Sequence, residues 1–261
     1  MTDSTSPFGQ GKYQVRFDWG AAGAERVLPG AHAVVVVDAL SFTTTAVVAA
    51  EHGVAVAPWP ADPAARARAE AFAAERGGIV AGARSAPGVP TLSPQGWAGV
   101  GASPVVVPSP NGGAIAHALG DRDVVVIAAA MRNRSAVAER LLALQAERGE
   151  RLVIAIVAAG EHERDGNGAG GALRFAVEDL LVAGAVVDAL VARGIDHTSP
   201  EAAVACAAFE GLARATVHLI RASGSGVELG GLGFAGDARL AAERDVTDVV
   251  PVLRDGVFRA A

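Results

Sequence analysis

Cysteine is almost absent from this sequence, since Cys206 is the only one in 261 residues. A single cysteine excludes an intrachain disulfide bond, and it excludes a thiolate cluster that holds zinc or an iron–sulfur centre. Cys206 lies among small residues in the stretch EAAVACAAFEGLA, which has helical character. A buried, inert side chain is therefore a better interpretation than a nucleophile. With no disulfide to form, we expect a cytoplasmic protein.

Long hydrophobic runs and clusters of basic residues are also missing. The mean hydropathy is +0.33, yet the apolar runs are far shorter than the roughly 18 residues that a membrane-spanning helix needs. The formal net charge is −6 at pH 7, and no stretch concentrates lysine or arginine. Both facts argue against a nucleic acid or an anionic membrane as partner. A small anion remains an acceptable ligand, because single arginines and backbone N–H groups are enough to bind it.

Aromatic residues are only 5% of the chain, while 51% of it is hydrophobic and 32 residues are glycine. Alanine and valine must then build the core, which suits helices packed closely on a sheet. The first stretch, MTDSTSPFGQGK, lacks the basic patch and the apolar segment of a signal peptide. We expect a flexible leader over residues 1–12 and a single domain over residues 13–261, a length that suits one large core.

Valine-rich runs of strand length alternate with helical stretches along the chain. The runs cover residues 33–39, 54–60, 105–109, 123–131 and 151–160. Continuous apolar strands followed by helices predict an α/β fold of three layers, α/β/α, with a largely parallel sheet that can include antiparallel strands. Residues 13–19 alternate and predict an edge strand, and residues 249–261 predict a terminal strand or hairpin.

Helix-capping residues, prolines and glycines mark several helix starts and loops in this pattern. Asp62 before Pro63 and Ser199 before Pro200 are typical of helix N-termini. The stretch SAPGVPTLSPQGWAGVGASP predicts a long loop after residues 78–84. A second, polar and glycine-rich loop is expected at EHERDGNGAGG, and a long helix follows it.

Polar residues occur where a buried strand gives way to a helix, the place where open α/β sheets bind ligands. Asp38 closes the first valine run, and Ser41, Thr43, Thr44 and Thr45 follow it. A carboxylate at a strand end is a common Mg²⁺ ligand, and hydroxyls with the N–H groups of a helix start can hold phosphate. Alternatively, Asp38 caps the helix and the threonines satisfy its N-terminus. Both interpretations stay open here.

Two further strand ends carry groups that suit an anion. In SPNGG, Asn111, Gly112 and Gly113 let backbone N–H groups converge, although an ordinary turn with a cap has the same pattern. In MRNRS, Arg132 and Asn133 stand at a helix start, where anion recognition competes with simple solvation. The charged run at residues 161–165 is a solvated loop by default, with a mobile lid as the alternative.

Glu178 and Asp179 are adjacent carboxylates in a nearly apolar helix, FAVEDLLVAGAVV. Neighbouring helical side chains point about 100° apart, so at least one of the two must face the interior or a cleft. An unpaired buried charge is costly. A metal ion or an arginine is therefore the expected partner.

Other familiar catalytic patterns are missing. The six histidines show no metal-ligand spacing, and neither a G-x-S-x-G elbow nor a Walker lysine occurs. The glycines of VELGGLGFAG follow no strand, so a dinucleotide site is not expected. DALSFT looks like the aspartyl-phosphate motif of haloacid-dehalogenase phosphatases, but Leu40 stands where that motif needs a second aspartate.

Several stretches, in order, resemble the 2-phosphosulfolactate phosphatase family, called ComB. The stretches are VVVVDALSFTTT, GARSAPG with LSP, SPNGG, MRNRSAVA, LVIAIVAAG, AVEDLLVAGAVV, and the tail SGSGVELGGLGFAGDARLAAERDVTDVVPVL. The resemblance implies the family's fold and a Mg²⁺-dependent hydrolysis of 2-phospho-3-sulfolactate to 3-sulfolactate and phosphate, a step of coenzyme M biosynthesis.

Carried over to this sequence, the resemblance points to the following residues: Asp38, Thr43, Thr44, Thr45, Asn111, Gly112, Asn133, Glu178 and Asp179. The chain also departs from the family pattern. LSF replaces a segment with an arginine near Ser41, Ala83 precedes Arg84 in place of a carboxylate, TLSP replaces Gly-Asn-Ser-Pro, and a cysteine is missing from VAAGEH.

The sequence therefore predicts a Mg²⁺-dependent phosphatase for a small anionic phosphate ester. Asp38 and Asp179 are the predicted catalytic residues, and Asp38, Glu178 and Asp179 are the predicted metal ligands. The predicted phosphate-binding residues are Ser41, Thr43, Thr44, Thr45, Arg84, Asn111, Gly112, Gly113, Arg132 and Asn133. A family member that only binds an anion or a protein partner, and a phosphatase for another substrate, are the alternatives. A homodimer is a further expectation.

Overall fold

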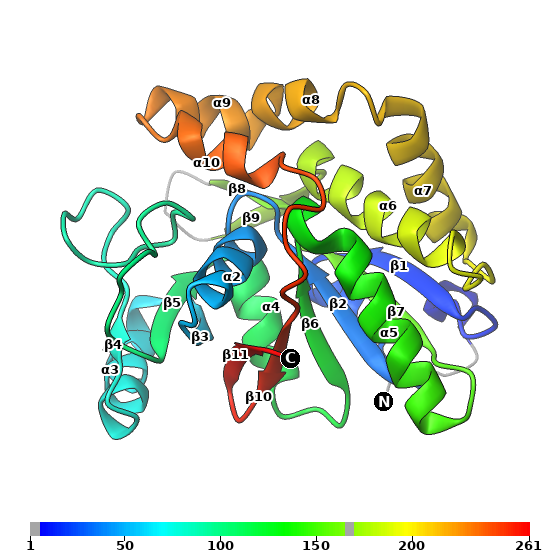
Figure 1. Cartoon of the computed structure of the whole chain (residues 1–261), viewed down its shortest axis with the longest axis horizontal. Coiled ribbons are helices and arrows are strands. Elements are labelled where there is room, and N and C mark those ends of the chain that lie inside the picture. Colours follow the sequence, from blue (N-terminus) through cyan, green and yellow to red (C-terminus); the bar gives the residue numbers. More distant parts are fainter. Residues whose placement is uncertain (1–5, 165–169) are drawn as a thin grey trace.

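Valine-rich strands form one large sheet in the computed structural model, which describes residues 6–164 and 170–261 (Figure 1). Within these residues the sheet has nine strands in the order β1-β7-β2-β6-β10-β11-β3-β5-β4. The strands are β1 Val15–Trp19, β2 Ala33–Val37, β3 Val56–Pro60, β4 Ile79–Val80, β5 Val105–Ser109, β6 Val125–Ala129, β7 Ile154–Ala158, β10 Pro251–Arg254 and β11 Val257–Ala260. The predicted α/β class is confirmed.

The sheet consists of two parallel parts joined by the C-terminal hairpin. Strands β1, β7, β2 and β6 are parallel to one another, and so are β3, β5 and β4. Between the two parts, β10 pairs antiparallel with β6 at Val252 and Ile127, while β11 pairs antiparallel with β3 at Phe258 and Val56. The sheet is therefore mixed. Both the predicted edge strand, β1, and the predicted terminal hairpin are present.

Helices cover both faces of this sheet (Figure 1). They are α1 Gly20–Val27, α2 Phe42–Glu51, α3 Arg66–Glu75, α4 Gly112–Leu119, α5 Arg134–Arg148, α6 Val177–Val191, α7 Pro200–Leu212, α8 Thr216–Ala222, α9 Gly224–Gly231 and α10 Ala235–Ala241. Short 3₁₀ helices cover Pro7–Gly9, Pro63–Ala65 and Met131–Asn133.

The alternation of side chains along each strand explains why the strands are apolar throughout. In β2, Val35 and Val37 pack with α5, α6 and α7, whereas Val34 and Val36 pack on the other face with α1, α2 and α4. Successive side chains of a strand point to opposite faces, so a strand covered on both sides needs apolar residues at every position. The same reason accounts for the apolar sequence of β6 and β7.

Helix starts agree with the sequence signals. The Asp62 side chain accepts a hydrogen bond from Ala64 N at 2.9 Å, with Pro63 in the first turn. Ser199 accepts one from Ala202 N at 3.1 Å, with Pro200 behind it. No single helix among the described residues is long and apolar enough to cross a membrane; α7 and α8 meet the criteria only as a pair bent by 107°.

The polar stretch after β7 is not simply a loop. Residues Glu161–Arg164 form β8 and Gly170–Arg174 form β9, an antiparallel hairpin separate from the main sheet. Neither strand shows apolar alternation, which is why the sequence pattern missed them. A Cβ on Gly171 would lie 2.4 Å from the carbonyl oxygen of Glu163, so glycine permits the close pairing. Asp165, part of the charged run, lies outside the described residues.

The expected leader, residues 1–12, is described only from Ser6 onward. In that part Gln10 is buried, and its side chain accepts a hydrogen bond from Phe17 N at 2.9 Å and donates one to Phe17 O at 2.8 Å. Residues after Ser6 therefore pack against β1. The division into a leader and one domain over residues 13–261 stays a prediction.

Candidate active site

Three loops at the carboxyl ends of strands bring the predicted site residues together. Asp38 follows β2, Asn111 and Gly112 follow β5, and the β8–β9 hairpin follows β7. The first turn of α6 adds Glu178 and Asp179. The tertiary structure thus gathers carboxylates from distant parts of the chain at one edge of the sheet.

Asp38 lies at the centre of this group and is only 4% exposed. Its Oδ1 accepts a hydrogen bond from Phe42 N at 3.1 Å, and its Oδ2 accepts one from Gly112 N at 2.7 Å. Burial raises the pKa of Asp38 to about 6, aided by the charges of Glu161 and Glu178 and opposed by the two N–H groups. Asp38 thus titrates close to neutral pH.

Glycine is needed beside Asp38. A Cβ on Gly112 would lie 2.5 Å from the Cβ of Asp38, and one on Gly113 would lie 2.7 Å from the Cβ of Ser109. The N–H of Gly113 points to Ser109 Oγ at 3.3 Å. The N–H groups of this turn, predicted to hold an external anion, therefore bind the protein's own carboxylate and hydroxyl.

Asp179 joins the ends of β2 and β7. Its Oδ1 accepts from Ala39 N at 2.7 Å and its Oδ2 from Gly160 N at 2.9 Å. The pKa of Asp179 is well above its usual range because of burial first, and then because of the charges of Asp38 and Glu178. The carboxylates therefore repel one another in a poorly solvated place.

Glu178 is 3% exposed, yet among the described residues its carboxylate takes part in none of the hydrogen bonds or ion pairs. Every fully buried side-chain nitrogen or oxygen in this part of the chain has a hydrogen-bond partner or solvent contact. Asp38 and Asp179 both feel its charge. The expectation that a carboxylate of this pair faces a cleft or a partner stays a prediction.

The three threonines hold the backbone around Asp38. Thr43 Oγ1 donates to Asp38 O at 2.8 Å and accepts from Asp38 N at 3.0 Å. Thr44 Oγ1 donates to Ala39 O and Thr45 Oγ1 to Leu92 O, both at 2.8 Å. Their role in phosphate binding stays a prediction, and it requires these hydroxyl protons to turn away from the carbonyls.

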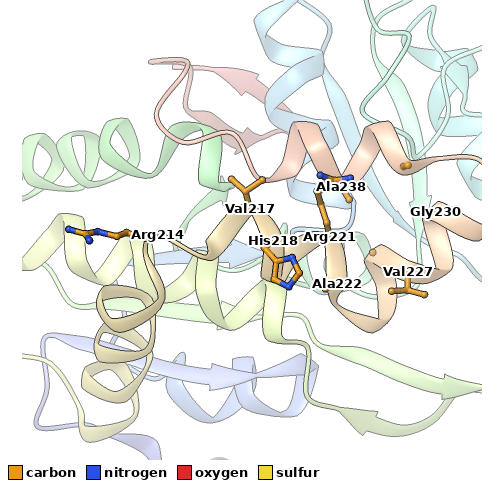
Figure 2. A pocket seen from close by; sticks show the side chains of 10 residues that line it. Arg214, Val217, His218, Arg221, Ala222, Val227, Gly230 and Ala238 are labelled. Carbon is orange, nitrogen blue, oxygen red and sulfur yellow. The ribbon is translucent and has the colours of Figure 1, made fainter.

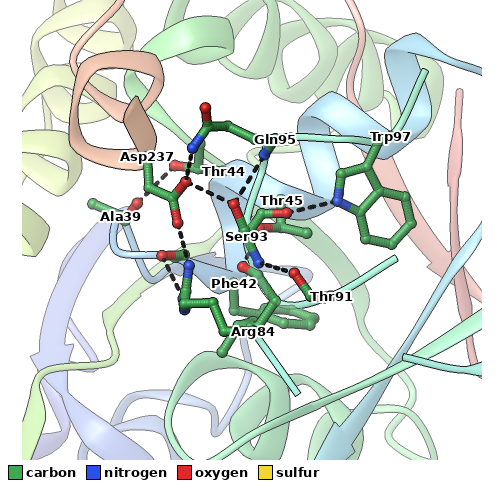
Figure 3. Close-up of polar contacts among 12 residues, drawn as sticks. Ala39, Phe42, Thr44, Thr45, Arg84, Thr91, Ser93, Gln95, Trp97 and Asp237 are labelled. Atoms are coloured by element: carbon green, nitrogen blue, oxygen red, sulfur yellow. Dashed lines mark hydrogen bonds and ion pairs between the residues drawn. The ribbon is translucent and has the colours of Figure 1, made fainter. Parts of the chain in front are cut away.

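Arg84 is the cation that the structure brings to this group of residues (Figure 3). Its Nη2 donates to Ser41 Oγ at 3.1 Å, and its Nη1 forms an ion pair with Asp237 of α10. Burial lowers the pKa of Arg84, whereas the charges of Asp237 and then Asp38 raise it. Arg84 therefore places a positive charge beside Ser41, in the segment where the family pattern has an arginine of its own.

Glu161 and His162 are site residues that the sequence interpretation assigned to a solvated loop. Asn111 Nδ2 donates to Glu161 Oε1 at 3.1 Å, and Asn111 Oδ1 lies 3.0 Å from His162 Nδ1. With the amide oxygen as acceptor, His162 carries its proton on Nδ1 and leaves Nε2 free. Their position directly after a strand end was the signal that could have identified them.

Arg132 and Asn133 bind the end of α2 and the C-terminal segment, and not the carboxylate group. Arg132 donates to both carboxylate oxygens of Glu51 at 3.0 Å and pairs with Glu243. Asn133 accepts from Ala130 N at 2.9 Å and donates to Val249 O at 2.9 Å. None of these contacts leads to Asp38, so anion recognition by this pair gains no support from the geometry.

The sequence model of the 2-phosphosulpholactate phosphatase family matches residues 24–256 of the chain. The chain belongs to the 2-phosphosulfolactate phosphatase family. It is similar to a protein of Deinococcus radiodurans named "probable 2-phosphosulfolactate phosphatase", with 30% identity over 239 residues, 88% of this chain and 92% of that protein. A 2-phosphosulfolactate phosphatase of Methanothermobacter thermautotrophicus is 39% identical over 83 residues, 32% of this chain and 34% of that protein.

Membership of the 2-phosphosulfolactate phosphatase family confirms the resemblance carried by the ordered motifs. It also confirms the enzyme class, because the family is one of phosphoric monoester hydrolases. Asp38, Glu178 and Asp179, which the resemblance singled out, lie within the matched residues and in one group.

A second group of possible metal ligands lies away from this family site. Oxygen and sulfur atoms of Asp188, Cys206 and Glu210 are within 4.8 Å of one another, and in the described part of the chain no other trio of such residues meets this distance. Asp188 already pairs with Arg134 at 2.6 Å. Burial raises the pKa of Cys206 to about 11, so the thiol keeps its proton at neutral pH and is a poor ligand.

A cavity of about 600 Å³ lies among the C-terminal helices α8, α9 and α10 (Figure 2). Its lining residues are Arg214, Val217, His218, Arg221, Ala222, Gly226, Val227, Gly230, Ala235 and Ala238. None of the predicted site residues belongs to it. The chemistry of the family site is therefore to be sought at Asp38 and not in this cavity.

Proposed function

We propose that this protein hydrolyses 2-phosphosulfolactate to 3-sulfolactate and phosphate with the help of Mg²⁺ at Asp38, Glu178 and Asp179. The observation that carries the proposal is Glu178, a buried carboxylate without a hydrogen bond in the described structure. Its charge acts on two neighbouring carboxylates, Asp38 and Asp179. Family membership supports the choice of 2-phosphosulfolactate as the substrate. We propose that it acts in coenzyme M biosynthesis, to which this reaction belongs.

A hydrated Mg²⁺ fits these carboxylates. Oxygen ligands are what Mg²⁺ prefers, and it usually keeps several water molecules. The retained water matters because the donor oxygens of Asp38, Glu178 and Asp179 do not all lie within 4.8 Å of one another. A divalent cation also offsets the repulsion that raises the pKa values of Asp38 and Asp179. When bound, Mg²⁺ polarises a phosphoryl oxygen and lowers the pKa of a bound water.

The chain's own residues supply the remaining functions. Arg84, beside Ser41, binds the negatively charged oxygens of the phosphate ester. The leaving alkoxide of the substrate needs a proton. Because Asn111 accepts from Nδ1–H of His162, the ring delivers a proton from Nε2 only as the imidazolium, after Nε2 has bound a second proton. Asp179 keeps the ends of β2 and β7 in register, so that the groups stay aligned.

The test is phosphate release by the purified protein with and without Mg²⁺. Three esters are compared: 2-phosphosulfolactate, phospholactate (which lacks the sulfonate) and p-nitrophenyl phosphate. We expect Mg²⁺-dependent release, fastest with 2-phosphosulfolactate. Asp38→Asn should lower the rate by at least about 100-fold, the usual effect of losing such a group.

Asp62→Asn is the matched control, because it removes a carboxylate from an exposed helix cap that is not one of the predicted site residues. A folded protein that releases no phosphate from any of the three esters contradicts the proposal and favours a protein that only binds an anion. Faster phosphate release from phospholactate would support phosphatase activity but contradict 2-phosphosulfolactate as the preferred substrate. A homodimer and a cytoplasmic location stay predictions.

A further inference from the structure

Helix α10 carries a buried carboxylate, Asp237, which is 0% exposed. Its Oδ1 accepts hydrogen bonds from Ser93 Oγ at 2.6 Å and Gln95 Nε2 at 2.8 Å. Its Oδ2 accepts from the guanidinium of Arg84 (Figure 3). A buried carboxylate with three side-chain donors is held in one orientation, and it holds its donors in return.

The three donors all come from the long loop between β4 and β5, which has little regular structure of its own. An arginine side chain on such a loop loses considerable rotamer entropy when it is fixed in one place. Asp237 supplies a fixed partner 153 positions along the chain from Arg84. The position of the guanidinium thus depends on a contact with α10 and not on the loop alone.

Two close contacts keep α10 near this loop. A Cβ on Gly236 would lie 2.5 Å from Gln95 Oε1, so a glycine next to Asp237 permits the approach. The ring of Phe234 lies 5.4 Å from the Arg84 guanidinium carbon. The helix therefore contacts Arg84 with both an anion and an aromatic ring.

The other end of the same guanidinium reaches the candidate active site. Nη2 of Arg84 donates to Ser41 Oγ at 3.1 Å, in the turn that follows Asp38. Arg84 consequently bridges α10 and the turn that carries Asp38. A lateral shift of the guanidinium, following loss of its anchor, would move the positive charge away from the phosphate-binding position.

We propose that Asp237 is a positioning residue for phosphate-ester binding: it touches no substrate and acts by orienting Arg84. This inference rests on the proposed function, because Arg84 is there assigned to the phosphate. It gives the C-terminal helices a role in substrate affinity, although they contain none of the metal-binding carboxylates.

The test is a double-mutant cycle with Asp237→Asn and Arg84→Gln. Steady-state kinetics give KM and kcat for 2-phosphosulfolactate, and calorimetry gives the Kd of inorganic phosphate. We expect either single substitution to raise KM and the phosphate Kd by about tenfold, the effect of one charge-assisted hydrogen bond, with a smaller change in kcat. The double variant should then resemble Arg84→Gln alone, because Asp237 acts only through Arg84.

Gln95→Ala is the matched control, since it removes another donor to Asp237 and leaves Arg84 in place. It should change KM by less than about twofold, within the effect of a mutation outside the site. If Asp237 merely docks α10, the losses in the cycle add and Gln95→Ala behaves like Asp237→Asn; either result overturns the proposal. If Asp237→Asn fails to fold, Asp237→Glu, which keeps the charge but displaces it, should raise KM, and an unchanged KM overturns the proposal.

The phosphate Kd separates this inference from the proposed function. If the wild-type protein cleaves no ester, the proposed function is wrong. The double-mutant cycle is then evaluated from the Kd of phosphate alone. Additive losses in that cycle, or no binding of phosphate by the wild type, would overturn the role of Asp237 independently.

Discussion

Asp38 shows how burial changes the chemistry of a single residue. Its pKa rises from the usual 3.8 to about 6, because desolvation and the neighbouring charges of Glu161 and Glu178 outweigh two backbone N–H groups. The folded protein therefore binds a proton that the unfolded chain has released between these two pH values. The stabilisation is fully present below pH 3.8 and is lost as the pH rises through 6.

In the metal-free protein, the free energy of unfolding should decrease from about pH 4 to about pH 7 by up to about 3 kcal/mol, the value of a two-unit pKa difference. Denaturant unfolding in EDTA measures it, as the difference between the wild type and Asp38→Asn. Asp62→Asn is the control and should keep the wild-type dependence. A pH-independent difference between the wild type and Asp38→Asn would contradict the raised pKa.

A substitution of Glu178 should raise the thermal stability of the metal-free protein and remove its stabilisation by Mg²⁺. Glu178→Gln removes one of the mutually repelling charges, so the metal-free protein should melt about 2–4 °C higher, as expected for about 1 kcal/mol in a chain of this size. The same change should abolish the rise in Tm that Mg²⁺ gives the wild type. Differential scanning calorimetry with and without Mg²⁺ measures both, and a variant that is still stabilised by Mg²⁺ would exclude Glu178 as a ligand.

At the scale of elements, the start of α2 is fastened to the end of β2 by a side chain. Thr43 both donates to and accepts from the backbone of Asp38, so the strand end and the helix form one rigid turn. The sequence pattern TTT was compatible with phosphate binding and with backbone satisfaction. The hydrogen bonds observed satisfy backbone groups.

Thr43→Val should therefore lower the free energy of unfolding by about 1–3 kcal/mol, because two buried backbone groups lose their partner. Thr43→Ser keeps the hydroxyl and is the matched control. Urea unfolding and the KM for 2-phosphosulfolactate are measured together. An unchanged stability with a raised KM would instead support the predicted contact with phosphate.

At the scale of the whole molecule, the C-terminal hairpin joins two parallel half-sheets. Phe258 of β11 is 1% exposed, pairs with Val56 of β3 and lies 6.2 Å from the ring of Phe42 at the start of α2. The last residues of the chain thus complete a sheet whose first strands come from its beginning. The hairpin therefore packs against the helix that begins next to the Asp38 turn.

Phe258→Ala should destabilise the protein by about 3–5 kcal/mol, the usual cost of a cavity left by a buried aromatic ring. Phe8→Ala is the control, since Phe8 is 73% exposed and its loss should change the stability by less than about 0.5 kcal/mol. Both are measured by denaturant unfolding. A small effect of Phe258→Ala would show that the hairpin is dispensable for the sheet.

Much of the fold was predictable because its causes are local. Apolar strands covered on both faces, the caps at Asp62 and Ser199 and the alternating edge strand each depend on a few neighbouring residues. The carboxylates Asp38, Glu178 and Asp179 were also identifiable, since a charge in an apolar segment needs a partner wherever it lies. Arg132 and Asn133 show the limit: their position at a strand end was correctly placed, but their partners Glu51, Glu243 and Val249 could not be read from it.

The sequence by itself determined the α/β class and the order of the strands and helices of the main sheet, and it singled out Asp38, Glu178 and Asp179, because periodicity and charge placement act over short stretches. Only the tertiary structure decided that the last hairpin enters the middle of the sheet, that Arg84 pairs with Asp237, and that His162 meets Asn111. Each of these joins residues far apart in the chain. Such contacts follow from how whole faces pack and which buried polar groups remain to be satisfied, and no local pattern encodes that choice.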